Sequence, residues 1–209
     1  LEYDAVNNEQ RKVVYGWRQA ILEGGDQSDR LGRWIHEFCK RLADSHMDLV
    51  SEAEDAEPDY DGLCRRFEQL FGAHDDVTSA NIEGMATKEI AQILGDTAVA
   101  AYVARRESYG TERMEPLERY LLLQTIDDKW KDHLHALDYL RTGVGMRGYG
   151  QEDPKIVYRR ESADYFRRMI EAVQESVIDL MMRVEPPESE SELAIARRSA
   201  PDPRPVALP

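Results

Sequence analysis

The sequence predicts an all-α protein, and two observations carry that prediction. Apolar side chains recur at steps of three and four in one segment after another, which places them on one face of a helix with 3.6 residues per turn. Helix-ending pairs such as Gly24-Gly25 and Gly110-Thr111 separate these segments. We therefore expect amphipathic helices joined by polar turns.

The first half of the chain is expected to hold four amphipathic helices, over residues 1–23, 29–50, 60–71 and 88–109. Nothing precedes the first of them to cap it, so we expect a longer helix that has been entered part-way. Ser28 or Asp29 is expected to cap the second helix, and Thr87 the fourth. Residues 51–60 form an acidic loop, and residues 72–86 are expected to be irregular.

Two further apolar stripes predict an antiparallel helical hairpin in the second half of the chain. Pro116 fits the first turn of the helix that leads into it. The first stripe comprises Leu123, Ile126, Trp130, Leu134, Leu137 and Leu140, and the second comprises Phe166, Met169, Val173, Val177, Leu180 and Val184. Two stripes joined by a polar loop can bury each other. We expect Trp130, Leu134, Leu137, Phe166 and Val173 to pack the hairpin and Asp127, Asp128, Lys131 and Asp132 to face water.

The loop of the hairpin is expected to run from Arg141 to Asp153, longer than the roughly 2–8 residues usual between packed helices. Four of the 13 glycines lie within residues 143–150. Asp153 is a good N-cap for the second helix, and Pro154 suits its first position. The loop is either a plain surface turn or an end that touches a partner, and the candidate contact residues are Val144, Met146, Arg147 and Tyr149.

Composition limits the function classes. The net charge of −14 argues against a nucleic-acid partner and against general attraction to anionic lipid. Charged residues make up 33% of the chain, no apolar run approaches the ~20 residues of a membrane span, and no signal peptide is evident, so we expect a cytosolic protein. Cys39 and Cys64 lack metal or redox spacing and are expected to be buried thiols.

The sequence carries no phosphate-binding loop of the Gly-x-x-x-x-Gly-Lys-Ser/Thr type, so we expect no ATP hydrolysis by this chain and name no catalytic residue. Asp132, His133, His135 and Asp138 suggest a metal or general-base cluster. A solvated helix face explains them better, and no metal site is predicted. No cysteine follows position 64, so no zinc site is expected near the C-terminus.

The hairpin residues resemble the two-helix finger of SecA, the ATPase that drives preproteins through the bacterial SecY channel. The resemblance runs in order through Leu123-Gln124-Thr125-Ile126-Asp127, Trp130-Lys131-Asp132-His133-Leu134, Asp138-Tyr139-Leu140-Arg141, Gly143-Val144, Arg147-Gly148-Tyr149-Gly150-Gln151, Asp153-Pro154 and Tyr158-Arg159-Arg160-Glu161. Residues 1–15 resemble the end of SecA's long scaffold helix, with Ala5 where a second Asp is usual. Met146, Glu152 and Val157 also depart from the family, which usually has Leu, a basic residue and Glu there.

The resemblance implies four segments: 1–28 as the end of the scaffold helix, 29–112 as the helical wing domain, 113–184 as the two-helix finger and 185–209 as a disordered tail. It implies a C-terminal part of a translocase whose ATP and Mg²⁺ sites lie in domains that this sequence lacks. The finger would engage the SecYEG channel and unfolded preproteins through Tyr149 and couple to the other SecA domains. The parent protein would be cytoplasmic and peripherally attached to the inner face of the cell membrane.

An alternative of another class is a free-standing helical adaptor that binds a partner helix or associates with itself. Two observations distinguish the translocase hypothesis from the adaptor hypothesis. A phosphate-binding loop upstream in the gene, or a crosslink from Tyr149 to a translocating preprotein, would favour the translocase.

Because the scaffold helix is expected to be cut, apolar surface on Val13, Val14 and Trp17 should be exposed. We expect light scattering to show concentration-dependent association of the chain. A strictly monomeric chain at high concentration would count against this expectation.

Overall fold

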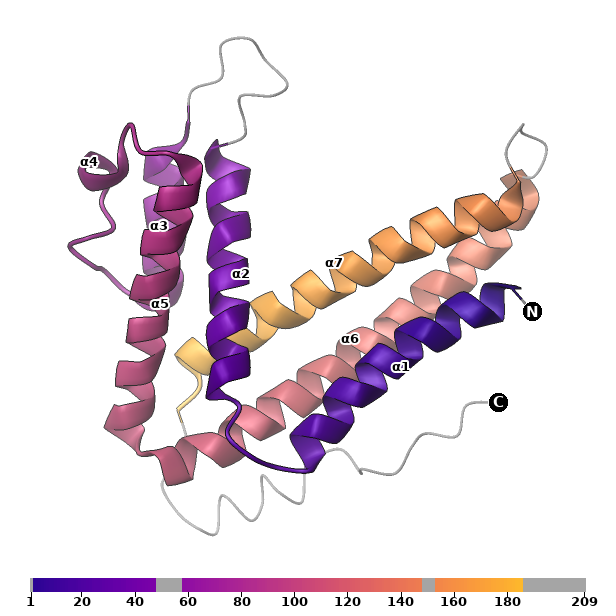
Figure 1. Ribbon diagram of the computed structural model, residues 1–209, viewed down its shortest axis with the longest axis horizontal. Helices are drawn as coiled ribbons and strands as arrows, with labels where there is room; N and C mark the ends of the chain where they lie inside the picture. The colour runs from indigo at the N-terminus through magenta and orange to yellow at the C-terminus, as the bar shows by residue number, and fades with distance from the viewer. Residues whose placement is uncertain (1, 48–57, 148–152, 186–209) are drawn as a thin grey trace. The chain divides into compact units, whose positions relative to one another are not determined.

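The structure, a computed structural model, describes residues 2–47, 58–147 and 153–185, and within these ranges all seven elements are α-helices (Figure 1). They are α1 (Glu2–Leu22), α2 (Ser28–Met47), α3 (Tyr60–Phe71), α4 (Ser79–Ile82), α5 (Thr87–Tyr109), α6 (Thr111–Arg147) and α7 (Pro154–Arg183). The all-α prediction is confirmed. The predicted tail and most of the predicted acidic loop lie outside the described residues.

The chain divides into two compact units, which we treat separately. The hairpin unit contains residues 1–25 and 116–177, and the α2–α5 unit contains residues 26–115 and 178–186. Residues 178–186, which include the end of α7, cluster with the α2–α5 unit. The four segments expected from the sequence, with boundaries after residues 28, 112 and 184, stay a prediction.

The α2–α5 unit is built on the pairing of α2 with α5, against which α3 packs. Its core is apolar and includes Leu31, Ile35, Phe38, Leu63, Phe67, Leu94, Ala98 and Tyr102. Two nitrogens of the Arg105 guanidinium on α5 donate hydrogen bonds at 2.9 Å. Nε donates to the Met181 carbonyl, and Nη2 donates to the Val184 carbonyl. Because the last carbonyls of a helix have no partner within it, these bonds hold the end of α7 in this unit.

Arg106 joins the segments at which the chain enters and leaves this unit. Its guanidinium donates to both carboxylate oxygens of Asp26, at 3.0 and 2.8 Å, and lies 3.4 Å from Glu115. Burial acts to raise the pKa of Asp26, but the bonds from Ser28 and Arg106 outweigh it and lower that pKa. The ion pair therefore favours the folded state while Asp26 is ionised.

Three local expectations in this unit are wrong. The segment 72–86 contains the short helix α4. Thr87 is the first residue of α5 and not its cap, since the N-cap position is Ala86. Helix α6 begins at Thr111, because the Gly110 carbonyl accepts the Arg113 and Met114 amides, and Pro116 therefore lies beyond the first turn.

In the hairpin unit, α1 lies alongside both α6 and α7 (Figure 1). The residues of α1 that face the hairpin alternate in steps of four and three; we call Tyr3, Asn7, Gln10, Val14, Trp17 and Ile21 the seam of α1. Such spacing is typical of helices packed side by side. Val14 and Ile21 are buried.

The expected exposure of the first helix is therefore only partly right. Val14 is buried and Trp17 half-buried, whereas Val13 is 41% exposed.

We expect Gly95→Ala to destabilise the α2–α5 unit. An added Cβ would collide with the His36 ring on α2, lying 2.7 Å from its Cε1 atom. Overpacking of this kind costs about 1–3 kcal/mol, more than the ~1 kcal/mol that alanine gains over glycine in a helix. The free energy of unfolding, measured by urea denaturation, should fall.

The matched control is Gly32→Ala on α2, where a Cβ meets no atom within 4 Å. We expect it to leave stability unchanged or to raise it. His36→Ala should rescue Gly95→Ala, and failure of that rescue would show that the His36 contact is not the cause.

Candidate functional site

The predicted site lies at the end of the hairpin, where α6 ends and α7 begins. Of its four predicted residues, only Val144 has a described side chain. It is 2% exposed and packs in a cluster with Leu137, Leu140 and Tyr158. Met146 and Arg147 lie within α6, but their side chains, like all of Tyr149, fall outside the described residues. Their contact role stays a prediction, and Val144 is a core residue here.

The connection between the hairpin helices is shorter than predicted. Helix α6 continues through Gly143 and Gly145 to Arg147, so only residues 148–153 separate it from α7. Packing explains the difference, because Leu140 and Val144 both bury against Tyr158 and offset the ~1 kcal/mol that each glycine costs in a helix. Asp153 caps α7 as predicted, since its carboxylate accepts the Lys155 amide at 2.9 Å.

The start of α1 packs against the same end of the hairpin. The Tyr158 hydroxyl donates to Asn7 Oδ1 at 2.9 Å, and the Tyr3 ring meets the Tyr158 ring edge-on, with 4.6 Å between centroids. The Arg141 guanidinium lies over the Tyr3 ring at 5.7 Å. Burial raises the pKa of Tyr158, so its hydroxyl stays protonated and can donate. Side chains from all three helices therefore meet here.

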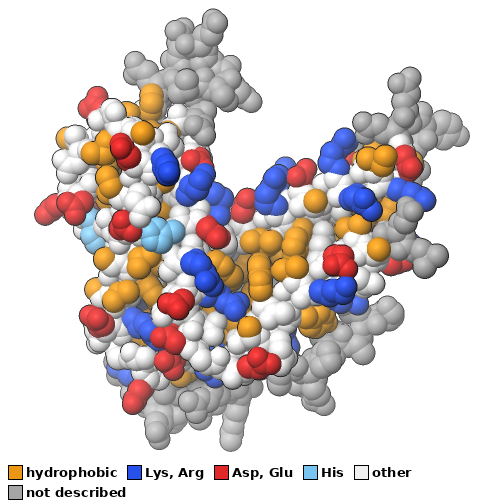
Figure 2. Space-filling view, in the orientation of Figure 1, with side chains coloured by type: hydrophobic (Ala, Val, Ile, Leu, Met, Phe, Trp, Pro, Cys, Tyr) orange, Lys and Arg blue, Asp and Glu red, His pale blue; other side chains and the backbone are white. Residues whose placement is uncertain are grey.

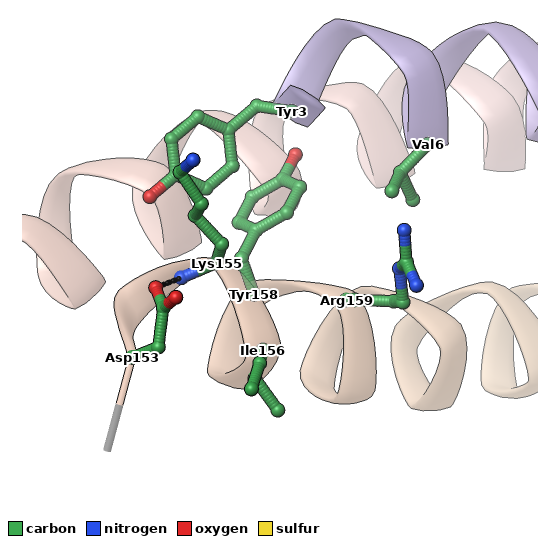
Figure 3. Close-up of a pocket in the computed structure, with 7 residues that line it drawn as sticks. All are labelled: Tyr3, Val6, Asp153, Lys155, Ile156, Tyr158 and Arg159. Atoms are coloured by element: carbon green, nitrogen blue, oxygen red, sulfur yellow. Dashed lines mark hydrogen bonds between the residues drawn. The ribbon is translucent and has the colours of Figure 1, made fainter. Parts of the chain in front are cut away.

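A hollow of about 300 Å³ opens beside this cluster, between the start of α1 and the start of α7 (Figure 3). It is lined by Tyr3, Val6, Asp153, Lys155, Ile156, Tyr158 and Arg159. Aromatic and aliphatic groups dominate the lining, with two cations and one carboxylate. This mixture suits contact with a polypeptide or another helix, and it contains no pair of groups arranged for nucleophilic or acid–base chemistry.

The five residues predicted to pack the hairpin lie along its length. Trp130, Leu137 and Val173 are buried, whereas Leu134 and Phe166 are half-buried. The two helices contact each other in opposite order along the chain, Val144 near Tyr158 and His133 near Phe166, so they are antiparallel as predicted.

A buried polar contact, which we call the Gln10 bridge, joins all three helices near the middle of α1. Its members are Gln10 on α1, His133 on α6 and the backbone carbonyl of Ser162 on α7. Gln10 Nε2 donates to the Ser162 carbonyl at 3.1 Å, and Gln10 Oε1 lies 2.8 Å from His133 Nε2. All three residues are buried, and His133 is 4% exposed.

The chemistry of the bridge fixes its proton positions. A carbonyl oxygen only accepts, so the Gln10 amide must turn its NH₂ toward Ser162 and its oxygen toward His133. His133 Nε2 must then carry a proton and donate it. The Trp130 and Phe166 rings lie on the imidazole, with centroids 5.4 and 5.6 Å away. Burial lowers the pKa of His133 to about 4, so the ring is neutral at neutral pH.

His133 was expected on the solvated face of its helix, and this expectation is wrong, because the residue is buried in the bridge. A signal was present in the spacing: Ile126, Trp130, His133, Leu137 and Leu140 follow each other in steps of four and three. Asp127, also predicted to face water, accepts two bonds from Arg18 of α1, at 3.0 and 3.2 Å. Only 11% of the Arg18 side chain is exposed.

Neither a metal site nor a reactive thiol is found among the residues that the structure describes. His133 is buried and His135 exposed, and within those residues no three His, Cys, Asp or Glu side chains are grouped to hold a metal ion. Burial raises the pKa of the Cys39 thiol to about 12, and it also raises the pKa of the half-buried Cys64. Neither thiol is activated as a nucleophile.

The face shown in Figure 2 carries both signs of charge, with Lys and Arg side chains scattered among Asp and Glu and hydrophobic side chains exposed between them. Among the described helices, none combines the length and the hydropathy needed to cross a membrane.

These features define a helical scaffold module, whose described residues make contacts between helices. A family model for the SecA Wing and Scaffold domain matches residues 1–185, and the chain belongs to this family.

Individual relatives agree with this assignment. The chain is 36% identical over 184 residues to the protein translocase subunit SecA of Carboxydothermus hydrogenoformans, which covers 88% of this chain and 21% of the relative. It is 34% identical to the subunit of Pelotomaculum thermopropionicum over the same length, and 36% identical to that of Syntrophobacter fumaroxidans over 185 residues. The chain thus spans about a fifth of the relatives that it matches.

We expect acid to destabilise the chain through His133. An unfolded histidine titrates near pH 6.5 and folded His133 near pH 4, so between these values the unfolded state binds more protons. The stability that neutral His133 confers is present above about pH 6.5 and is lost as the pH falls to 4, by about 3 kcal/mol in total. Urea unfolding at a series of pH values measures this loss.

His133→Gln should remove that part of the pH dependence, whereas His135→Gln, at an exposed position on the same helix, should leave it in place. Comparison with these variants separates His133 from the carboxylates that titrate in the same range. If the free energy of unfolding falls equally with pH in the unmodified chain and in both variants, the expectation is wrong.

Proposed function

We propose that this chain is the wing and scaffold part of an ATP-driven preprotein translocase of the SecA type, in which the α6–α7 hairpin engages the SecY channel and the moving polypeptide. The observation that carries the proposal is the attachment of α1 to both hairpin helices within a chain of this family. ATP hydrolysis, with its Mg²⁺, would belong to other domains of the whole protein.

The hairpin has the form of a stiff arm. Helix α6 has 37 residues and α7 has 30, so α6 is about 55 Å long at 1.5 Å per residue. Helix α1 is held to the arm at three levels, by Asn7, Gln10 and Arg18. Because these contacts are spread along α1, a displacement of α1 would move the arm as one body.

The far end of the arm suits contact with many different polypeptides. An aromatic face offers apolar area without requiring one particular hydrogen-bond partner, and this is the role we propose for Tyr149. Met146 and Arg147 would add contact area and charge. Val144 supports the end of α6 from within, since it packs on Tyr158.

The proposed partners are the SecYEG channel, unfolded preproteins and the other domains of the same motor. The net charge of −14 would repel anionic lipid, so we propose that attachment to the cytoplasmic face of the membrane comes through the channel.

Tyr149→Ala in the full-length protein tests the proposal. We expect preprotein transport into membrane vesicles to fall at least about tenfold, the effect of losing about 1.4 kcal/mol of contact energy. ATP hydrolysis in the absence of preprotein should stay within about twofold, because we propose that the nucleotide sites belong to other domains of the whole protein.

Two variants control this experiment. Tyr149→Phe keeps the aromatic face and should retain transport. Tyr139→Ala removes another tyrosine of the hairpin, which is 79% exposed, and should have little effect. Undiminished transport by Tyr149→Ala would refute the proposed contact and favour a helical adaptor that works through other surfaces.

A further inference from the structure

We propose that Gln10 is a positioning residue that fixes α1 on the hairpin, so that movement of α1 reaches α6 and α7 at the same point. This inference rests on the proposed function. It goes further by naming the side chain through which the scaffold helix and the hairpin are coupled.

Gln10 lies near the middle of the seam of α1. Its neighbours along the seam, Asn7 and Val14, lie one step before and one step after it. A buried polar residue in such a seam costs stability, but it permits only the alignment in which its partner is opposite. Sliding α1 by one turn, about 5.4 Å, would bury the Gln10 amide and the His133 N–H without partners.

The Gln10 side chain contacts both hairpin helices. The Gln10 amide has one end that donates and one that accepts, and each end has a different helix as its partner: Ser162 on α7 and His133 on α6. Asn7, by comparison, bonds Tyr158 on α7, and Arg18 bonds Asp127 on α6. The Gln10 side chain is thus placed to keep α6 and α7 in step.

The His133 ring is itself held by the hairpin. Trp130 and Phe166 contact it from α6 and α7, and its Nε2 proton points at Gln10. Residues of the hairpin therefore orient the imidazole toward α1. A preoriented donor makes the alignment of α1 more specific than a flexible surface side chain would.

The test separates positioning from stability by replacing both polar partners. In Gln10→Leu/His133→Leu, neither partner is left buried and unpaired, so the fold should survive. The Ser162 carbonyl lies inside α7, where the helix itself supplies a donor. The seam then has no polar residue at this level to select one alignment.

We expect the double variant of the full-length protein to hydrolyse ATP normally while moving less polypeptide. The number of residues transported per ATP should fall roughly fivefold or more, the range of typical coupling between sites. Gln19→Leu, an exposed change on the same helix whose amide bonds only Glu23, should leave this ratio unchanged. Thermal unfolding of each variant shows that the comparison is made between folded proteins.

If the double variant fails to fold, the number of residues transported per ATP can be measured with Gln10→Met instead. It keeps the length of the side chain and removes both bonds, and a reduced ratio in the folded variant supports the inference. Full transport per ATP in either folded variant overturns it. Tyr149→Ala tests the proposed contact function independently. If Tyr149→Ala loses transport while the Gln10 variants keep full transport per ATP, the role of Gln10 is rejected and the proposed function is not.

Discussion

The hairpin unit depends on the burial of one narrow face of α1 against two long antiparallel helices. Burial of Val14 and Ile21 stabilises the packing of α1 but does not select one alignment of the helix. The hydrophobic effect depends on the apolar area removed from water, and neighbouring alignments bury about the same area. Direction comes from the few polar groups on that face. Asn7, Gln10 and Arg18 each meet a defined partner, and the three contacts are satisfied together in one alignment.

The two units use buried polar groups in different ways. In the α2–α5 unit, Arg105 and Arg106 are bound to carbonyl oxygens and carboxylates at the edges of the helices. In the hairpin unit, the Gln10 bridge lies inside the apolar interface and carries no charge, since burial keeps His133 neutral. A neutral bridge avoids the large cost of placing an ion among apolar side chains.

Local spacing was enough to predict every described helix except the short α4, together with the hairpin and the cap at Asp153, because each depends on residues within a few positions of one another. Two kinds of feature escaped it. The glycines at 143 and 145 predicted a loop, but long-range packing of Val144 on Tyr158 kept them helical. His133 and Gln10 are polar, so their place in an apolar spacing did not by itself predict burial, and the two residues lie 123 positions apart in the sequence. The tip residue Tyr149 was recognised through family resemblance, and its role stays a prediction.

The burial of Cys39 has a practical consequence for site-directed labelling. A fully buried thiol with a pKa of about 12 is almost entirely protonated at neutral pH, so alkylating and disulfide-forming probes react with it very slowly. Cys64 is the only other cysteine in the sequence. Replacing that single residue by serine would leave a background in which a cysteine introduced at the end of the hairpin is the preferred target of crosslinkers.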